Sequence, residues 1–208
     1  MKIFLYSLSV DEKQINVLKG LLGKSKNTIT VGLIENAADV VTEGPEGWLE
    51  EIRNSIIEYG FQLHLIDLRK FVNDEMSLSE IMKSVDIIWV GGGNMYYLRY
   101  LLQITKADKI IKKLVTSGKV YCGWSAGGCV VGPTLLDGEN MDDISKAPEL
   151  IYDGINLVDF VMIPHIDNEY FSNQAKEWSK KLEGRKIKTV QLMDNQAIVV
   201  EDNSIRII

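Results

Sequence analysis

Gly123, Ser125 and Gly127 form a Gly-x-Ser-x-Gly pattern directly after the short apolar run at residues 120–124. On a tight strand-to-helix turn, a serine hydroxyl projects out of the sheet, and flanking glycines avoid collisions with neighbouring backbone. The backbone N–H of Ala126 would then point to the place where an oxyanion forms. The pattern predicts a nucleophilic serine, and the alternative is a glycine-rich turn in which Ser125 only caps a helix.

A serine hydroxyl is a poor nucleophile unless a base takes its proton, and the sequence has two histidines. His165 follows Pro164 at the end of an apolar run, so we expect it on the same rim of the sheet as Ser125. His64 lies in the middle of a strand-like run, where we expect packing to fix its side chain. We therefore predict that His165 is the base.

An acid must orient the imidazole of such a histidine. Asp194 ends a strand-like run and is our candidate, with Asp167, Asp142 and Asp143 as alternatives. The resulting chain order, Ser then His then Asp, differs from the Ser, Asp, His order of typical α/β-hydrolases. The order favours a separate lineage.

A run of three glycines, residues 91–93, follows another apolar stretch. It is no P-loop, because no Gly-Lys-Ser/Thr follows, and Tyr96 stands where a dinucleotide-binding fingerprint needs glycine. We expect the N–H groups of Gly92 and Gly93 to complete an oxyanion hole with that of Ala126. The alternative is a turn that only leads into the next helix.

The elements that must position these residues alternate along the chain as apolar strands and amphipathic helices, which predicts one α/β domain over residues 1–208. Most strands are too apolar to have a wet face, so we expect a mostly parallel sheet with helices on both faces. Ligands of such sheets bind outside the carboxyl ends of the strands, where both Ser125 and the glycine run lie. The strands are expected at residues 3–8, 28–34, 61–68, 85–90, 120–124, 158–163, 188–192, 197–200 and 204–208. Helices are expected at residues 11–22, 48–59, 78–82, 96–103, 107–116 and 171–182, and a loop at residues 35–47.

Composition excludes several classes of function. The net charge of −6, without a Lys/Arg cluster, argues against a nucleic-acid partner. No apolar stretch has the length of a signal peptide or a membrane span, so we expect a cytoplasmic protein with no membrane partner. Cys122 and Cys129 are expected to be free buried thiols in a reducing compartment. Two histidines and two cysteines supply no spaced ligand set, so we expect no metal and no cofactor.

Four stretches together resemble the peptidase E family, which includes the aspartyl dipeptidases and the cyanophycinases. They are residues 88–94 (Ile-Trp-Val-Gly-Gly-Gly-Asn), 123–128 (Gly-Trp-Ser-Ala-Gly-Gly), 164–165 (Pro-His) and 192–197 (Leu-Met-Asp-Asn-Gln-Ala). The resemblance implies a flavodoxin-like three-layer sandwich, similar to class I glutamine amidotransferases with serine in place of cysteine.

The same resemblance implies a serine hydrolase acting on small peptides or dipeptides through an acyl-enzyme. Ser125 is then the nucleophile, His165 the base and Asp194 the third member, while Asn94 and Asp143 are candidate substrate contacts. The acidic stretch near Asp143 also matches a family stretch implicated in activity, which keeps the third role open.

One departure from the family limits the substrate. Aspartyl dipeptidases are expected to carry an arginine shortly after the histidine, yet residues 166–175 hold no cation and two acids. A substrate carboxylate lacks a bidentate partner there unless the fold brings in Arg99 or Arg185. Alternative functions are a catalytically silent binding domain on the same scaffold, or an esterase or amidase. A homodimer is one option for the assembly.

Overall fold

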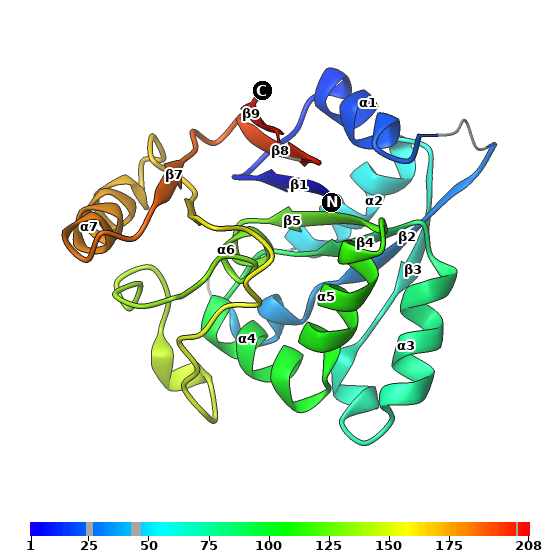
Figure 1. The fold of residues 1–208 in the computed structure, drawn as a ribbon, viewed down its shortest axis with the longest axis horizontal. Helices are drawn as coiled ribbons and strands as arrows, with labels where there is room; N and C mark the ends of the chain where they lie inside the picture. The colour runs from blue at the N-terminus through cyan, green and yellow to red at the C-terminus, as the bar shows by residue number, and fades with distance from the viewer. Residues whose placement is uncertain (24–26, 43–46, 203) are drawn as a thin grey trace.

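The computed structural model describes residues 1–23, 27–42, 47–202 and 204–208, and its centre is a seven-stranded sheet (Figure 1). The strand order is β3-β2-β4-β5-β1-β8-β9, in which the first five are parallel and the last two are antiparallel. Two short parallel strands, β6 and β7, pair separately. The strands are β1 (Lys2–Tyr6), β2 (Ile29–Ile34), β3 (Phe61–Leu65), β4 (Ile87–Val90), β5 (Val120–Trp124), β6 (Val161–Ile163), β7 (Thr189–Gln191), β8 (Ala197–Glu201) and β9 (Ser204–Ile207).

Helices cover both faces of this sheet, with α1 and α2 on one side and α3, α4 and α5 on the other (Figure 1). The α-helices are α1 (Glu12–Gly20), α2 (Trp48–Glu58), α3 (Glu75–Ser84), α4 (Met95–Ile104), α5 (Ala107–Thr116), α6 (Ala126–Cys129) and α7 (Ser172–Gly184). Three short 3₁₀ helices are η1 (Asn36–Val40), η2 (Leu68–Phe71) and η3 (Ile144–Lys146). Among the described residues, no helix is long and apolar enough to cross a lipid bilayer.

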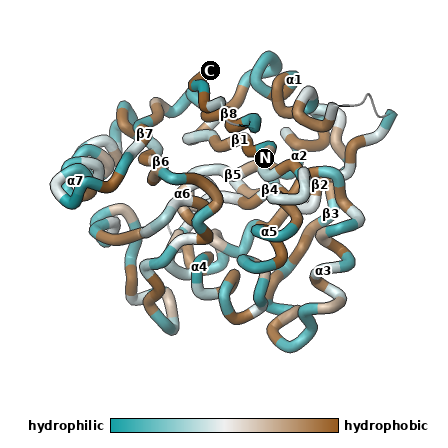
Figure 2. Tube along the Cα trace, in the orientation of Figure 1, coloured by the Kyte–Doolittle hydropathy of each residue, from teal (hydrophilic) through white to brown (hydrophobic). Residues whose placement is uncertain are grey.

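Side chains of each central strand alternate between two apolar cores, because successive residues of a strand point to opposite faces. In β1, Ile3 and Leu5 join the core beneath α3, α4 and α5, whereas Phe4 and Tyr6 join the core beneath α1 and α2. In Figure 2, brown segments recur through the inner part of the molecule, whereas the outer helix α7 is mostly teal and white. The expected three-layer α/β fold is confirmed.

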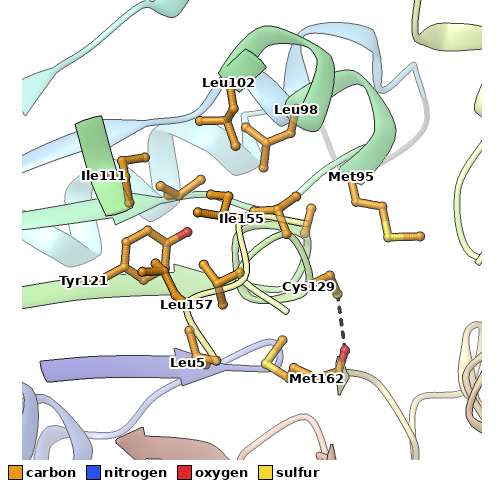
Figure 3. Close-up of a cluster of buried hydrophobic side chains, with 14 of the residues drawn as sticks. Leu5, Met95, Leu98, Leu102, Ile111, Tyr121, Cys129, Ile155, Leu157 and Met162 are labelled. Atoms are coloured by element: carbon orange, nitrogen blue, oxygen red, sulfur yellow. Dashed lines mark hydrogen bonds between the residues drawn. The ribbon is translucent and has the colours of Figure 1, made fainter. Parts of the chain in front are cut away.

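The larger core extends to the turn after β5. Figure 3 shows Met162 of β6 and Cys129 of α6 in one apolar cluster with Leu5, and the Cys129 thiol donates a hydrogen bond to the Met162 carbonyl at 3.5 Å. Both cysteines are free and buried, as expected. Burial raises the pKa of both thiols well above the usual range, so they remain protonated.

Several boundaries differ from the expectations. The expected loop at 35–47 contains η1, and residues 43–46 of it lie outside the described residues. Helix α3 is longer than expected because Asp74 caps it, accepting a hydrogen bond from the Ser77 N–H. The expected strand at 158–163 is reduced to Val161–Ile163 and pairs with β7 rather than joining the main sheet.

Candidate active site

The turn after β5 holds Ser125 in a strained backbone conformation, with φ 45° and ψ −111°. A Cβ on Gly123 would lie 2.6 Å from the Gly127 carbonyl oxygen, and one on Gly127 would overlap the Val90 carbonyl. Only glycine fits at either position, so close backbone packing fixes the turn. The Ser125 N–H also donates to the Tyr6 carbonyl of neighbouring β1 at 3.0 Å. The serine is therefore anchored on both sides at the carboxyl edge of the sheet.

His165 meets Ser125 from the segment that follows β6. Its Nε2 lies 2.9 Å from the Ser125 Oγ, within hydrogen-bond reach. The side chain is buried, and its backbone takes the left-handed conformation with φ 64°.

Asp194, three residues beyond the end of the β6–β7 pairing, contacts the other imidazole nitrogen. Its Oδ1 lies 2.7 Å from the His165 Nδ1, and its Oδ2 accepts a hydrogen bond from the Asn168 Nδ2 at 2.6 Å. The Ile166 N–H donates to the Leu192 carbonyl at 3.1 Å, so the two segments lie side by side. The sequence-predicted serine, histidine and acid thus come together in one hydrogen-bonded row.

Ser7 joins this row, although sequence reasoning did not single it out. Its Oγ accepts the His165 backbone N–H at 2.8 Å and lies 3.4 Å from both the His165 Nδ1 and the Asp194 Oδ1. Ser7 is fully buried directly after β1. Because β1 is parallel to β5, its end lies at the same edge as Ser125, and that topological argument could have found it.

The rival acids occupy other places. The Asp167 carboxylate accepts the Asp194 N–H at 2.8 Å and so holds the Asp194 segment. The Asp143 side chain is exposed and accepts the Ser145 N–H at the start of η3. Asp142 lies near the serine, in the same cavity, but no hydrogen bond joins it to His165 in the described residues.

Asp142 is a carboxylate enclosed among apolar groups. Desolvation raises the pKa of Asp142 to about 6, although the Met95 N–H, donating at 2.9 Å, opposes the shift. A carboxyl group with this pKa is mostly ionised at neutral pH and becomes protonated as the pH falls below 6.

The backbone N–H groups of Gly92, Gly93 and Ala126 have no acceptor within the described part of the chain. A Cβ on Gly92 would lie 3.2 Å from the Trp124 ring and 3.3 Å from the Ser125 Cβ, so this backbone passes directly beside the serine. Gly93 has a different constraint, because its φ is 132° and a Cβ would overlap the Ala37 backbone. Free donors next to the serine fit an oxyanion site.

A cavity of about 530 Å³ opens at this edge. Its walls are mainly apolar and aromatic, with Glu51, Asp142 and His165 as the acidic and basic side chains among the described lining residues. The lining consists of Leu8, Val41, Trp48, Glu51, Ile52, Ser55, Gly92, Gly93, Met95, Trp124, Ser125, Ala126, Cys129, Met141, Asp142, Pro164, His165, Phe171 and Trp178.

Asn94 and Asp143 were predicted as substrate contacts but do not line this cavity. The Asn94 amide caps α4 through the N–H groups of Tyr96 and Tyr97 and donates to the Asp143 carbonyl. The neighbouring Asp142, whose carboxylate accepts the Met95 N–H, does line the cavity.

The other candidates lie away from the serine. Arg99 pairs with Asp108, and Arg185 pairs with Asp137, so neither supplies a cation to the cavity. His64 lies on the edge strand β3 and is exposed, so the expectation that packing fixes its side chain was wrong. Strands β2 and β4 separate β3 from β5. Within the described residues, no three His, Cys, Asp or Glu side chains gather as metal ligands.

A mostly parallel sheet with a strained serine, a histidine and a carboxylate in one row at its carboxyl edge has the architecture of a serine hydrolase. The comparisons with known proteins identify the family of serine hydrolases to which the chain belongs. The chain belongs to peptidase family S51, whose family model matches residues 6–208, and it is a serine peptidase. The expected peptidase E resemblance is thereby confirmed.

Individual relatives agree with this placement. The chain is 32% identical to peptidase E of a Nostoc species over 197 residues, covering 92% of this chain and 76% of the relative. It is 30% identical to an uncharacterised peptidase of Listeria innocua over 190 residues, covering 89% and 84%. A crystal structure from Listeria monocytogenes, provisionally named peptidase E, superposes with a TM-score of 0.84 at 25% identity, covering 99% of this chain and 96% of that one.

Proposed function

We propose that Ser125 is the nucleophile of this peptidase and that His165 and Asp194 complete its catalytic triad. The observation that carries the proposal is the row of two contacts, 2.9 Å from the Ser125 Oγ to the His165 Nε2 and 2.7 Å from the His165 Nδ1 to the Asp194 Oδ1. The Asp194 carboxylate holds the tautomer that leaves Nε2 free to accept a proton.

The reaction then proceeds in two halves. The Ser125 Oγ attacks the peptide carbonyl carbon while its proton passes to His165, and the carbonyl oxygen becomes an oxyanion facing the N–H groups of Gly92, Gly93 and Ala126. His165 then gives the proton to the leaving amine as the C–N bond breaks, which leaves an acyl-enzyme on Ser125. Water, deprotonated by His165, attacks the acyl carbon, and the released Ser125 Oγ takes the proton back.

We propose small peptides with a free N-terminus as substrates. The cavity volume suits a dipeptide rather than a long chain, and the Asp142 carboxylate supplies a counter-charge for an α-ammonium group. Asp142, rather than the predicted Asp143, is then the substrate contact. A substrate carboxylate side chain would have no cationic partner among the described lining residues, which argues against N-terminal aspartate.

A fluorophosphonate probe with intact-mass and peptide mapping tests the nucleophile. Labelling is expected at Ser125 alone, and Ser125→Ala should remain folded, lose labelling and lose about 10⁴-fold or more in turnover. The thiol of Cys129 lines the same cavity and serves as the internal control. A folded wild-type protein that is not labelled would favour a silent binding domain. Faster turnover of simple esters than of any peptide would favour an esterase.

The cellular location and the assembly state of the protein also remain proposals. A reducing, cytoplasmic location is supported by the two buried free thiols and is measured by cell fractionation. The homodimer is measured by sedimentation equilibrium.

A further inference from the structure

Residues from both apolar cores, which lie on opposite faces of the sheet, line the cavity, and we call the two sets of lining residues its lobes. One wall consists of Trp48, Ile52 and Trp124, which belong to the core beneath α1 and α2. These three residues, with the neighbouring lining residues Glu51 and Ser55, make up what we call the α2 lobe. The opposite wall belongs to the other core and carries Asp142. Ser125 follows Trp124 at the sheet edge between the two lobes.

Each lobe carries one carboxylate. Glu51 forms no ion pair with any described residue, and no Lys or Arg is among the described residues that line the cavity. The cation nearest to Glu51 in sequence, Arg53 on the same helix, is already paired with Glu35. The α2 lobe therefore offers an uncompensated negative charge to whatever enters it.

The rest of the α2 lobe is aromatic and aliphatic. The Trp48 and Trp124 rings meet edge to face with centroids 5.7 Å apart, and Ile52 packs in the same core. Glu51 itself is solvent-exposed, so the carboxylate lies at the rim of an apolar wall. A long apolar stem that ends in a cation matches this order of surfaces, because lysine and arginine bury their methylenes and keep the charge near water.

We propose that the α2 lobe selects a lysine or arginine side chain on the N-terminal residue of the peptide substrate. The inference rests on the proposed function, in which Asp142 binds the α-ammonium of the residue whose carbonyl Ser125 attacks. The Cα of that residue sends its ammonium and its side chain in different directions. With the ammonium in the lobe of Asp142, the side chain enters the α2 lobe and reaches Glu51.

The test compares kcat/KM for four dipeptides that share a C-terminal alanine and begin with lysine, norleucine, leucine or aspartate. Norleucine has the lysine stem without the charge, so the lysine-to-norleucine ratio isolates the cation. An exposed ion pair contributes modestly, and we expect a ratio of about fivefold, with the aspartate peptide slowest.

Glu51→Gln should bring the lysine-to-norleucine ratio close to one. The matched control is Glu50→Gln, which removes the same charge one residue away, at a position that does not line the cavity. Glu51→Arg should raise the rate for the aspartate peptide relative to lysine.

A wild-type ratio near one, an unchanged ratio in Glu51→Gln, or the aspartate peptide as the best substrate would overturn the inference. Cleavage of the leucine peptide that depends on Ser125 would still support the proposed function in each of these cases. If no dipeptide were cleaved and the fluorophosphonate left Ser125 unlabelled, the proposed function would fail and this inference with it.

Discussion

Two regions meet at the candidate active site, and they position their functional groups by different physics. Steric exclusion fixes the turn after β5, since Gly123 and Gly127 pack against backbone that admits no side chain. Polar contacts hold His165 and Asp194 in the segments after β6 and β7, with donors from Asn168 and a shared contact to Ser7. The serine is thus placed by shape and its partners by hydrogen bonds.

This difference predicts what each kind of mutation does. A side chain at a turn glycine would overlap backbone atoms that cannot move aside, so we expect a substitution there to prevent folding. The loss of one hydrogen bond has a modest effect on stability, so we expect a substitution of a polar residue to keep the fold intact and to change the catalytic rate. The experiments below separate the two, from the largest expected effect to the smallest.

The largest effect is expected for His165→Ala. Nucleophile and base act as one unit, so turnover should fall about as far as in Ser125→Ala, by roughly 10⁴-fold or more, and the double mutant should be no worse than either. Steady-state kinetics on one dipeptide measures this. His64→Ala is the control and should keep wild-type rate and stability, because its side chain is exposed on β3. An additive double mutant would separate the two residues into independent roles.

Asp194→Asn should come next, with kcat lower by up to about 10⁴-fold and the fold intact, because the amide favours the wrong imidazole tautomer. Asp142→Asn should instead raise KM. Since the pKa of Asp142 is about 6 in the free protein, the wild-type affinity should weaken as pH falls through 6, when the carboxylate is protonated.

The variant Asp142→Asn should lack that pH-dependent difference, which a comparison of KM from pH 5 to 8 would detect. A collapse of kcat in Asp142→Asn, together with near-normal kcat in Asp194→Asn, would transfer the third role to Asp142.

The glycine run combines both kinds of positioning within two residues. Gly92→Ala places a Cβ in tight contact with the Trp124 ring and Ser125, so we expect a folded protein that is slower by about 10²-fold as the oxyanion donor shifts. Gly93→Ala must overlap the Ala37 backbone at a φ of 132°, so we expect loss of cooperative folding. Urea unfolding followed by circular dichroism, together with kinetics, distinguishes them. Equal stability of both variants would contradict the steric account.

The sterically defined region was the one that the sequence predicted well. Gly-x-Ser-x-Gly after an apolar run is local, so the neighbours that enforce it are mostly within the pattern itself. The alternation of apolar strands and helices likewise predicted the layers, because the hydrophobic periodicity that distinguishes a strand from a helix is visible within a few neighbouring residues.

The long-range features were harder to predict. Ser7 and His165 are 158 residues apart, and no local pattern marks a serine after a first strand as a contact of a distant histidine. Asp142 and Asp143 are adjacent in sequence, and distant contacts such as the Met95 N–H to the Asp142 carboxylate and the Asn94 amide to the Asp143 carbonyl accompany the placement of Asp142 in the cavity wall. β6 and β7 pair outside the main sheet, and no local pattern in their sequences separates them from the strands that join it.

The smallest effect is expected for Ser7→Ala, and it probes the polar side of the comparison most directly. The buried hydroxyl accepts the His165 N–H at 2.8 Å and is near both the imidazole and the Asp194 carboxylate. Its loss removes hydrogen bonds of modest net strength, so kcat should fall by about tenfold with KM unchanged. Ser9→Ala is the matched control, since the Ser9 hydroxyl is exposed and contacts only the Asp194 backbone carbonyl, at 3.5 Å. A rate loss explained entirely by lower thermal stability would reduce Ser7 to a packing residue.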